Sequence, residues 1–376
     1  MIGFNAVLLN PSAGGIGTYM LNIIQEFNDM ISDDILKIYL STNQYTKYNN
    51  FSKFKAIKTP LLSDNPNQRV LLENLYWKGQ LKEDGIDLFH SPISYIPYNL
   101  NVPAIVTIHD LRVFRFPETY TRLRALFLKQ SIKYSVKKAK KIITISEFTK
   151  NELLDILDVS PDKIEVVHEG IDTALYEKTN INSTYGILGK YNISKPYIFT
   201  VGHLEPRKNY LRLIKAYESL PNEYKDEFNL VIGGKENFNF KSLYQYVSKN
   251  SLEDKVIFTG FIADKDLPVL YHNAELFIFP SIYEGFGFPP LESLASGVAV
   301  VASNATSMPE VLGNAAEYFD PYSIENIKES LKKVLGDNSR RDELLKNSKE
   351  ILKRLTWENC ARRTKDIYAN VLEKHL

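Results

Sequence analysis

The sequence predicts an α/β protein built from two doubly wound domains. Short apolar runs of strand length alternate along the chain with longer amphipathic segments, an order typical of parallel sheets with helices on both faces. The length of 376 residues exceeds what one ordinary hydrophobic core supports, so two domains are expected. The contents of 44% hydrophobic and 24% charged residues are ordinary for a globular protein that folds in water.

The predicted strands fall into two sets of six. The first set comprises Ile2–Leu9, Leu36–Ser41, Leu88–His90, Ala104–Ile108, Ile142–Ile145 and Ile164–Val167. The second set comprises Tyr197–Val201, Leu230–Ile232, Val256–Thr259, Leu276–Phe279, Val298–Ala302 and Glu317–Phe319. Between the sets, residues 173–195 are polar and contain two glycines, which favours a linker. We therefore expect domains over residues 1–172 and 196–356, joined by a linker over 173–195.

A glycine-rich turn follows the first predicted strand. Residues 10–19 read Asn-Pro-Ser-Ala-Gly-Gly-Ile-Gly-Thr-Tyr and precede a helical pattern from Met20 to Phe27. Gly14 and Gly15 would let the backbone approach a phosphate or a sugar closely, and the helix start would supply N–H donors. The spacing does not match the dinucleotide pattern G-x-G-x-x-G. This mismatch disfavours a nicotinamide dehydrogenase.

His109 stands at the end of the predicted strand Ala104–Ile108. A histidine at a strand end is more often a hydrogen-bonded structural residue than a ligand-binding one. Its position alone therefore favours the structural interpretation.

The segment Arg122–Lys141 contains eight basic residues and no acidic one. Leucine, phenylalanine, isoleucine and valine residues are interleaved with the basic ones at helical spacing. Two interpretations stay open. The segment is either an ordinary surface helix with a solvated basic face or a helix that lies against an anionic lipid surface.

A basic loop follows the strand Tyr197–Val201, with Gly202 first and then Arg207 and Lys208. Adjacent cations at a strand end can neutralise a diphosphate, whose charge grows when it leaves a sugar. A bare Arg-Lys pair is more often the start of a solvated helix, so the interpretation depends on what accompanies it.

The most informative segment, residues 284–292, follows the strand Leu276–Phe279 and reads Glu-Gly-Phe-Gly-Phe-Pro-Pro-Leu-Glu. The two prolines suit the first turn of a helix, and the two glycines permit a sharp turn before it. The helix start presents N–H groups and a positive dipole end, which favour a phosphate. Glu284 and Glu292 flank this anion site and are suited to accept hydrogen bonds from sugar hydroxyls.

With these motifs the chain resembles the retaining family-4 glycosyltransferases of the GT-B fold over nearly all of its length. The matching segments are Glu-x7-Glu at 284–292, the loop at 201–209, the Gly-Ile-Gly turn at 15–17 and Ile108–Leu111. The resemblance implies two Rossmann-like domains that face each other across a cleft. It assigns the acceptor to the first domain and the nucleotide sugar to the second. It also implies that a helix over about residues 357–376 packs back on the first domain.

The resemblance implies roles for individual residues. His109, Arg207, Lys208 and Glu284 would act in catalysis: His109 and Glu284 beside the donor sugar, and Arg207 and Lys208 on the leaving diphosphate. Glu292 would hold the ribose hydroxyls. The other implied donor-binding residues are Gly14, Gly15, Gly202, Gly234, Lys235, Phe261, Ile262, Gly285, Phe286, Gly287, Phe288 and Leu291. The base would lie near Gly234-Lys235 and Phe261-Ile262, held mostly by backbone groups.

The resulting hypothesis is a retaining transferase that moves a hexose from a nucleoside diphosphate to a saccharide or a lipid-linked glycan. The turn at 15–17 together with the loop at 204–209 resembles the mannosyltransferase branch, which favours GDP-mannose over UDP-glucose as donor. The chain has no Asp-x-Asp pair at a predicted strand end, so neither a metal nor another cofactor is expected and the nucleotide sugar is a substrate. The alternatives are a UDP-glucose-dependent transferase and a non-catalytic sugar-nucleotide-binding protein.

Charge and composition limit the partners and the location that can be expected. The 46 basic and 45 acidic residues leave a net charge of +1, so nucleic acid is not an expected partner. The single cysteine, Cys360, excludes an internal disulfide and a cysteine-rich zinc site. The start of the chain lacks a signal-peptide pattern, and no apolar run approaches the roughly 18 residues of a membrane span. A cytoplasmic protein is expected, with a peripheral position on the inner face of the membrane if the basic segment binds lipid.

Overall fold

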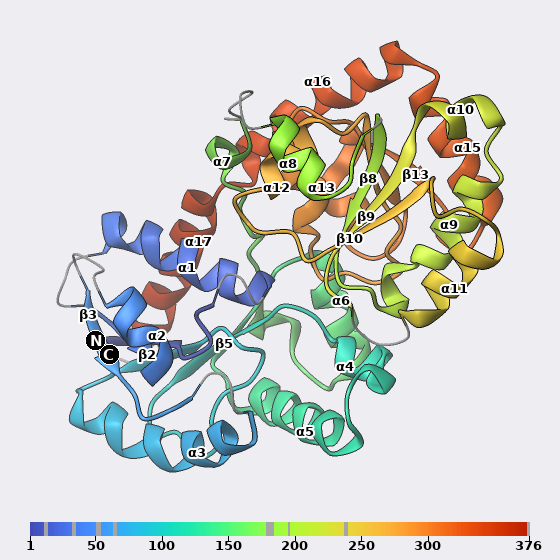
Figure 1. Cartoon of the computed structure of the whole chain (residues 1–376). Coiled ribbons are helices and arrows are strands. Elements are labelled where there is room, and N and C mark those ends of the chain that lie inside the picture. The colour runs from blue at the N-terminus through green and yellow to red at the C-terminus, as the bar shows by residue number, and fades with distance from the viewer. Residues whose placement is uncertain are drawn as a thin grey trace. The chain divides into compact units, whose positions relative to one another are not determined.

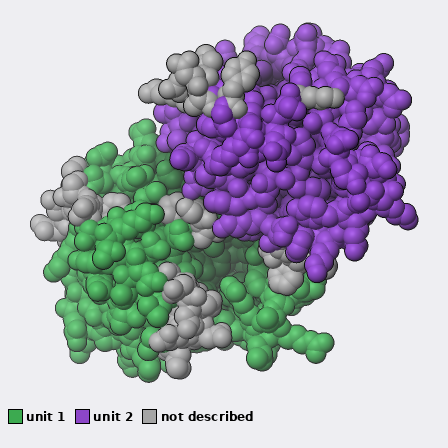
Figure 2. All heavy atoms as spheres, in the orientation of Figure 1, with its two compact units in different colours: residues 1–170, 355–376 green, residues 171–354 purple. Residues whose placement is uncertain are grey.

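A computed structural model describes residues 1–10, 14–31, 35–49, 54–62, 66–177, 184–194, 196–236 and 240–373. The chain divides into two compact units, traced in Figure 1 and coloured green and purple in Figure 2. Unit 1 comprises Met1–Gly170 and Leu355–Leu376, and unit 2 comprises Ile171–Arg354. Each unit contains one parallel sheet with helices, which confirms the predicted α/β class.

Unit 1 is built on seven parallel strands in the order β3-β2-β1-β4-β5-β6-β7. The strands are β1 (Ile2–Ala6), β2 (Leu36–Leu40), β3 (Lys55–Lys58), β4 (Leu88–Ser91), β5 (Ala104–Ile108), β6 (Lys141–Thr144) and β7 (Ile164–Val166). Every residue of β1 and β5 is buried, as expected for parallel strands with both faces covered. The strand order reverses between β1 and β4, the kind of switch point at which open α/β sheets bind ligands.

The edge strand β3 was not predicted from the sequence. Its residues Lys-Ala-Ile-Lys alternate exposed lysines with half-buried apolar residues, so it lacks a continuous apolar run. Lysines are common on edge strands because they discourage pairing with a further chain. The predicted strands are all present, with ends that shift by at most three residues, as where Ile2–Leu9 becomes Ile2–Ala6.

The helices of unit 1 are α1 (Gly15–Met30), α2 (Thr42–Tyr48), α3 (Pro66–Glu83), α4 (Arg112–Arg115), α5 (Arg122–Lys138), α6 (Glu147–Ile156) and α17 (Trp357–Glu373). Helix α17 packs against α1 (Figure 1), and Lys365 Nζ donates a hydrogen bond of 2.9 Å to the Met30 carbonyl. The last helix therefore belongs to unit 1. Gly170 lies where the returning chain passes, and the backbone of Trp357 leaves no room there for a side chain.

Unit 2 contains six parallel strands in the order β10-β9-β8-β11-β12-β13. The strands are β8 (Tyr197–Val201), β9 (Asn229–Gly233), β10 (Val256–Gly260), β11 (Leu276–Phe279), β12 (Val300–Ser303) and β13 (Ala316–Phe319). The helices are α7 (Thr173–Glu177), α8 (Thr184–Lys190), α9 (Tyr210–Glu218), α10 (Asn222–Glu227), α11 (Lys241–Lys249), α12 (Leu267–His272), α13 (Phe288–Ala295), α14 (Met308–Leu312), α15 (Ile324–Leu335) and α16 (Asn338–Arg354). The order reverses between β8 and β11, so the loops after these two strands meet at the switch point.

The segment at 173–195 differs from the predicted linker. Its described part forms α7 and α8, and both pack within unit 2. Tyr176 of α7 contacts the Tyr271 ring edge-on at 6.0 Å, and Lys190 of α8 pairs with Asp266 at 2.5 Å. The chain changes unit at Gly170–Ile171, before the polar stretch. That polarity reflects the exposed faces of two short helices.

Candidate functional site

The loop after β8 brings Arg207 and Lys208 to the switch point of unit 2. Gly202 opens the loop at φ 154°, and a Cβ there would lie 3.0 Å from Lys208 Cε and from the Tyr210 hydroxyl. A short 3-10 turn over Pro206–Lys208 follows, and Asn209 then adopts the left-handed conformation before α9. Glycine at position 202 therefore leaves the space through which the lysine side chain runs.

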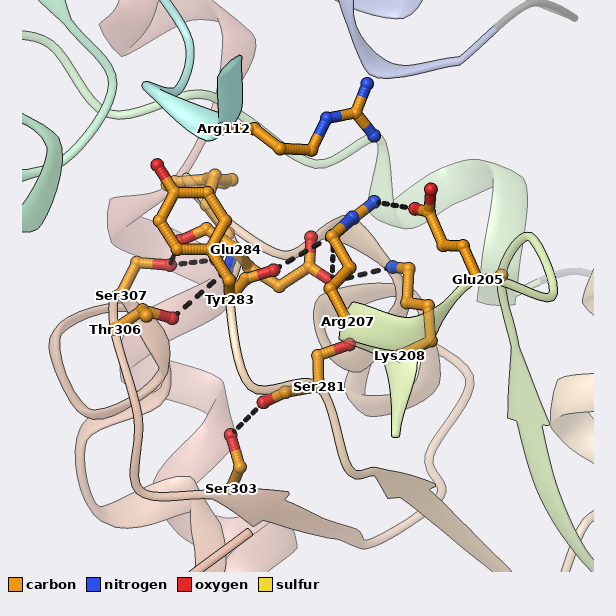
Figure 3. Close-up of polar contacts among 12 residues, drawn as sticks. Arg112, Glu205, Arg207, Lys208, Ser281, Tyr283, Glu284, Ser303, Thr306 and Ser307 are labelled. Atoms are coloured by element: carbon orange, nitrogen blue, oxygen red, sulfur yellow. Dashed lines mark hydrogen bonds and ion pairs between the residues drawn. The ribbon is translucent and has the colours of Figure 1, made fainter. Parts of the chain in front are cut away.

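The turn between β11 and α13 carries the predicted Glu-x7-Glu segment. Helix α13 begins at Phe288, so the two prolines occupy its first turn as predicted. Gly287 has φ 108°, and the Met308 side chain fills the space a Cβ would need. The loop before α14 braces the turn, since Ser307 Oγ donates to the carbonyls of Glu284 and Phe286 at 3.1 and 2.9 Å. Thr306 Oγ1 also accepts from the Glu284 amide at 3.2 Å (Figure 3).

Two cations and two carboxylates form a compact ion cluster at the ends of β8 and β11 (Figure 3). Glu284 Oε1 accepts from Lys208 Nζ at 2.6 Å and from Arg207 Nη1 at 2.7 Å. The second guanidinium branch, Arg207 Nη2, contacts Glu205 Oε1 at 2.6 Å. The four side chains are between 2% and 14% exposed. The structure thus brings together three residues predicted for catalysis and adds Glu205, which the sequence analysis missed.

The electrostatics of the cluster keep Glu284 ionised. Burial alone would raise the pKa of its carboxyl, but the charges of Arg207 and Lys208 outweigh burial and lower that pKa to about 2. Burial lowers the pKa of the Lys208 ammonium, and Glu284 opposes this effect. A diphosphate at this position would take over the same two cations.

Glu292 lies on α13 and has different partners. Tyr271 of α12 donates its hydroxyl to Glu292 Oε2 at 2.8 Å, and the hydroxyl of Tyr176 of α7 also acts on this carboxyl by lowering its pKa. Burial raises the pKa of Glu292, while the two tyrosine hydroxyls oppose the rise. Neither tyrosine was predicted as a site residue.

The residues predicted to lie near the base follow β9 and β10, and Gly202 follows the neighbouring strand β8. Backbone hydrogen bonds join them: Gly202 N to Gly233 O at 2.9 Å and Gly234 N to Gly260 O at 2.8 Å. Gly234 has φ 135°, and the Gly202 backbone occupies the space of a Cβ. Beside them the Phe261 ring is 51% exposed, with Lys235 Nζ 4.4 Å from its centroid. Ile262 is buried.

The other predicted residues of the 284–292 segment contribute mainly to the turn. Phe286 and Leu291 are 3% and 0% exposed, so their side chains belong to the core of unit 2. The rings of Phe286 and Phe288 meet edge-on at 5.7 Å. Gly285 is buried. These positions can reach a ligand through backbone groups at the start of α13.

His109 lies in unit 1, at the end of β5, with both ring nitrogens engaged by the protein. Nε2 is 2.9 Å from the Pro92 carbonyl, and Nδ1 is 3.2 Å from Glu169 Oε1. A carbonyl only accepts, so Nε2 is the donor in its contact with Pro92. The Tyr19 ring packs edge-on against the imidazole at 5.0 Å. The ring is therefore held on three sides, and burial raises the pKa of Glu169.

The glycine-rich turn also lies in unit 1. Gly14, at φ 123°, precedes α1, and the position of a Cβ there is open for at least 4 Å. Gly15 begins the helix, whose first turn has neither an acidic residue nor a capping side chain. Its first amides can therefore serve an anion. Residues 11–13 of the predicted turn lie outside the described residues.

Both halves of the chain match family models. Residues 13–175 match the model described as Glycosyltransferase Family 4, and residues 189–351 match Glycosyl transferases group 1. The chain is 31% identical over 365 residues to O-antigen chain mannosyltransferase B of Escherichia coli, an alignment that covers 94% of this chain and 95% of the relative. The chain belongs to glycosyltransferase family 4.

Solved structures share the fold of this glycosyltransferase. Sucrose-phosphate synthase from Thermosynechococcus elongatus superposes with a TM-score of 0.79 at 18% identity, covering 99% of both chains. HepE from Anabaena in complex with UDP-glucose gives a TM-score of 0.76 at 18% identity, covering 98% of this chain and 99% of that chain. The predicted GT-B class with two Rossmann-like domains is confirmed.

At the switch point of unit 2, the glycosyltransferase carries the cationic side chains of Arg207 and Lys208. In the part of the chain that the structure describes, no group of three or more His, Cys, Asp or Glu side chains is placed to hold a metal ion. The buried guanidinium and ammonium groups supply positive charge that is already oriented by Glu205 and Glu284. Such preorganised charge stabilises a developing anion most strongly where water is excluded.

Proposed function

We propose that this glycosyltransferase moves mannose from GDP-mannose to a saccharide or a lipid-linked glycan, with retention of configuration and without a metal or other cofactor. The observation that carries the proposal is the convergence of Arg207 and Lys208 on one oxygen of Glu284. The mannosyltransferase from Escherichia coli, which aligns along almost the whole chain, supports the choice of sugar.

The proposed chemistry uses the cluster in two ways. Arg207 and Lys208 bind the diphosphate and stabilise the charge it gains as the bond from the anomeric carbon to the phosphate oxygen breaks. Glu284 then accepts a hydrogen bond from a sugar hydroxyl. The acceptor oxygen bonds to the same face of the anomeric carbon, and its proton passes to the departing phosphate oxygen. This front-face route gives retention without a protein nucleophile.

Mannosyl transfer can be tested directly with purified protein. GDP-mannose and UDP-glucose are incubated with a panel of saccharide acceptors, with and without excess chelator, and the anomeric configuration of the product is read by NMR. We expect transfer from GDP-mannose that survives chelation and gives the retained anomer. Faster transfer from UDP-glucose would overturn the donor assignment. Activity lost in chelator and restored by manganese would overturn metal independence, and an inverted product would overturn the route.

Helix α5 supports a position at the inner face of the membrane, where a lipid-linked acceptor would be found. Leu123 and Leu126 are 83% and 58% exposed, beside the exposed Arg122 and Arg124. Apolar side chains next to basic ones are the composition of an interfacial helix. Ile132 and Val136 are instead buried in the core of unit 1, and Lys141 pairs with Glu165 at 2.7 Å. Within the described residues, no helix has the length and apolarity to span a membrane.

A further inference from the structure

Two buried tyrosines converge on Glu292 from different elements of unit 2. Tyr271 is 0% exposed and donates to Oε2 at 2.8 Å, and Tyr176 is 7% exposed and lies close enough for its hydroxyl to lower the pKa of the same carboxyl. Their rings meet edge-on at 6.0 Å, so each ring limits the movement of the other. Helices α7 and α12 both pack against α13, the helix that carries Glu292. The carboxyl is therefore held by the packing of three helices.

The hydrogen-bonding capacity of the carboxylate limits what else it can bind. A carboxylate offers about four acceptor sites on its two oxygens. The Tyr271 hydroxyl uses one of these sites and the neighbouring Tyr176 hydroxyl can use a second, so about two are left for a ligand. Glu292 as a whole residue is of intermediate burial. A ribose presents two neighbouring hydroxyls, each of which can donate one hydrogen bond.

We infer that Tyr176 and Tyr271 are positioning residues that orient Glu292 to select the vicinal diol of a ribonucleotide over a 2′-deoxyribonucleotide. The inference rests on the proposed function, because that function makes Glu292 the ribose ligand. Beyond that function, the inference assigns a role to two residues outside the Glu-x7-Glu segment. It also predicts that the site distinguishes a ribonucleotide from a 2′-deoxyribonucleotide. A carboxylate that is free to rotate would accept one hydroxyl nearly as well as two.

The tyrosine hydroxyls also maintain the charge that this binding needs. Burial and the nearby Asp264 raise the pKa of Glu292, and the hydroxyls of Tyr271 and Tyr176 oppose the rise. Removing the hydroxyls raises the pKa of Glu292 further. The carboxyl then protonates at a higher pH, and a protonated carboxyl is a poorer acceptor for two ribose hydroxyls. Nucleotide affinity should fall with decreasing pH in every form, and the fall should begin at a higher pH in the phenylalanine variants.

Calorimetric titration of the full chain with GDP, UDP and their 2′-deoxy analogues tests the inference. Both Tyr176→Phe and Tyr271→Phe keep the ring and remove the hydroxyl. Tyr197→Phe is the matched control, since Tyr197 is also buried in unit 2 but donates to the Leu270 carbonyl at 2.7 Å. We expect the native protein to prefer the ribonucleotide by about ten- to hundredfold. Each single variant should lose roughly threefold of that preference, and the double variant should lose most of it.

The possible outcomes separate this inference from the function on which it rests. If the native protein binds neither GDP nor UDP, the proposed function fails. If it binds a ribonucleotide and the double variant keeps the native preference and pH profile, only the role of the tyrosines fails. Loss of preference in Tyr197→Phe as well would show a general packing effect and would also overturn the inference. Thermal melts identify an unfolded double variant, in which case the single variants decide.

Discussion

Glu284 and Arg207 are best understood together, because each limits the freedom of the other. Arg207 Nη1 bonds Glu284 Oε1 at 2.7 Å and the Tyr283 carbonyl at 2.9 Å, while its Nη2 bonds Glu205. A planar guanidinium held at several points loses little further freedom when it meets a diphosphate. The carboxylates therefore orient the arginine before any substrate binds.

Replacing Arg207 by alanine should lower turnover more than donor affinity. Its interaction with the leaving group strengthens as charge develops, and losing one such interaction costs on the order of 3 kcal/mol, or about a hundredfold in rate. Steady-state kinetics with GDP-mannose measure the split between kcat and KM. Arg212→Ala is the control, since Arg212 lies near the same loop and bonds Asn209 at 3.0 Å instead of the cluster. A variant with normal kcat would contradict the assignment.

His90 offers a prediction about pH and stability. It is fully buried between Tyr368 and Thr107, at 2.6 and 2.8 Å, and burial together with the neighbouring His109 lowers its pKa to about 3. The unfolded chain binds a proton at about pH 6.5, whereas the folded chain does not until much lower pH. The free energy of unfolding should therefore fall below about pH 6.5, by about 2 kcal/mol at pH 5 from this residue.

The measurement is urea unfolding of the native protein and of His90→Gln between about pH 7 and pH 5. The glutamine variant is expected to be less stable at neutral pH, because both hydrogen bonds are altered. Its stability should nevertheless fall less steeply with acid, since it has no imidazole to protonate. Equal slopes for the two proteins would show that His90 does not titrate as described.

At the scale of elements, α5 combines a buried part with exposed apolar and basic side chains. Its buried residues, such as Ile132 and Val136, hold it on unit 1, while its first turns present exposed leucine and arginine side chains. A purely solvated surface helix gains nothing from exposed leucines. The prediction of a lipid-binding helix therefore concerns the N-terminal turns of α5 as much as its lysines.

Vesicle sedimentation tests this prediction. The native protein should sediment with anionic vesicles at low salt and be released by salt, since each basic side chain near the surface contributes about 1 kcal/mol. Substituting Leu123 and Leu126 by serine, or Lys133 and Lys137 by glutamate, should weaken binding. The same charge change at the exposed Lys346 and Lys349 of α16 is the control. If equal amounts of protein sediment with neutral and anionic vesicles, α5 is an ordinary surface helix that does not bind lipid.

At the scale of the whole molecule, the chain leaves unit 1 after Gly170 and returns to it at Leu355. The returning helix supplies buried side chains to unit 1, among them Trp357, Cys360 and Tyr368. Unit 1 is thus incomplete until the end of the chain is available. Unit 2, by contrast, is one continuous segment.

A chain that ends at Arg354 should keep unit 2 folded and lose the fold of unit 1. Without α17, the large apolar side chains that it covers are exposed, and losing several such contacts costs several kcal/mol. Hydrogen exchange read by mass spectrometry would show native protection in β8–β13 and lost protection in β1–β7. Native protection of β1–β7 in the shortened chain would show that α17 is dispensable.

Local patterns in the sequence determined the strands, the start of α13 and the residues Arg207, Lys208, Glu284 and Glu292, because apolar runs, prolines and adjacent charges act on neighbouring residues. Partners distant in the chain were decided only by the tertiary structure. Tyr176 and Glu292 are 116 positions apart, and His109 and Glu169 are 60 apart. No local pattern pairs them, since their contact depends on how strands and helices pack. The same reason explains the folded segment at 173–195 and the edge strand β3, whose conformations depend on neighbours supplied by the rest of the fold.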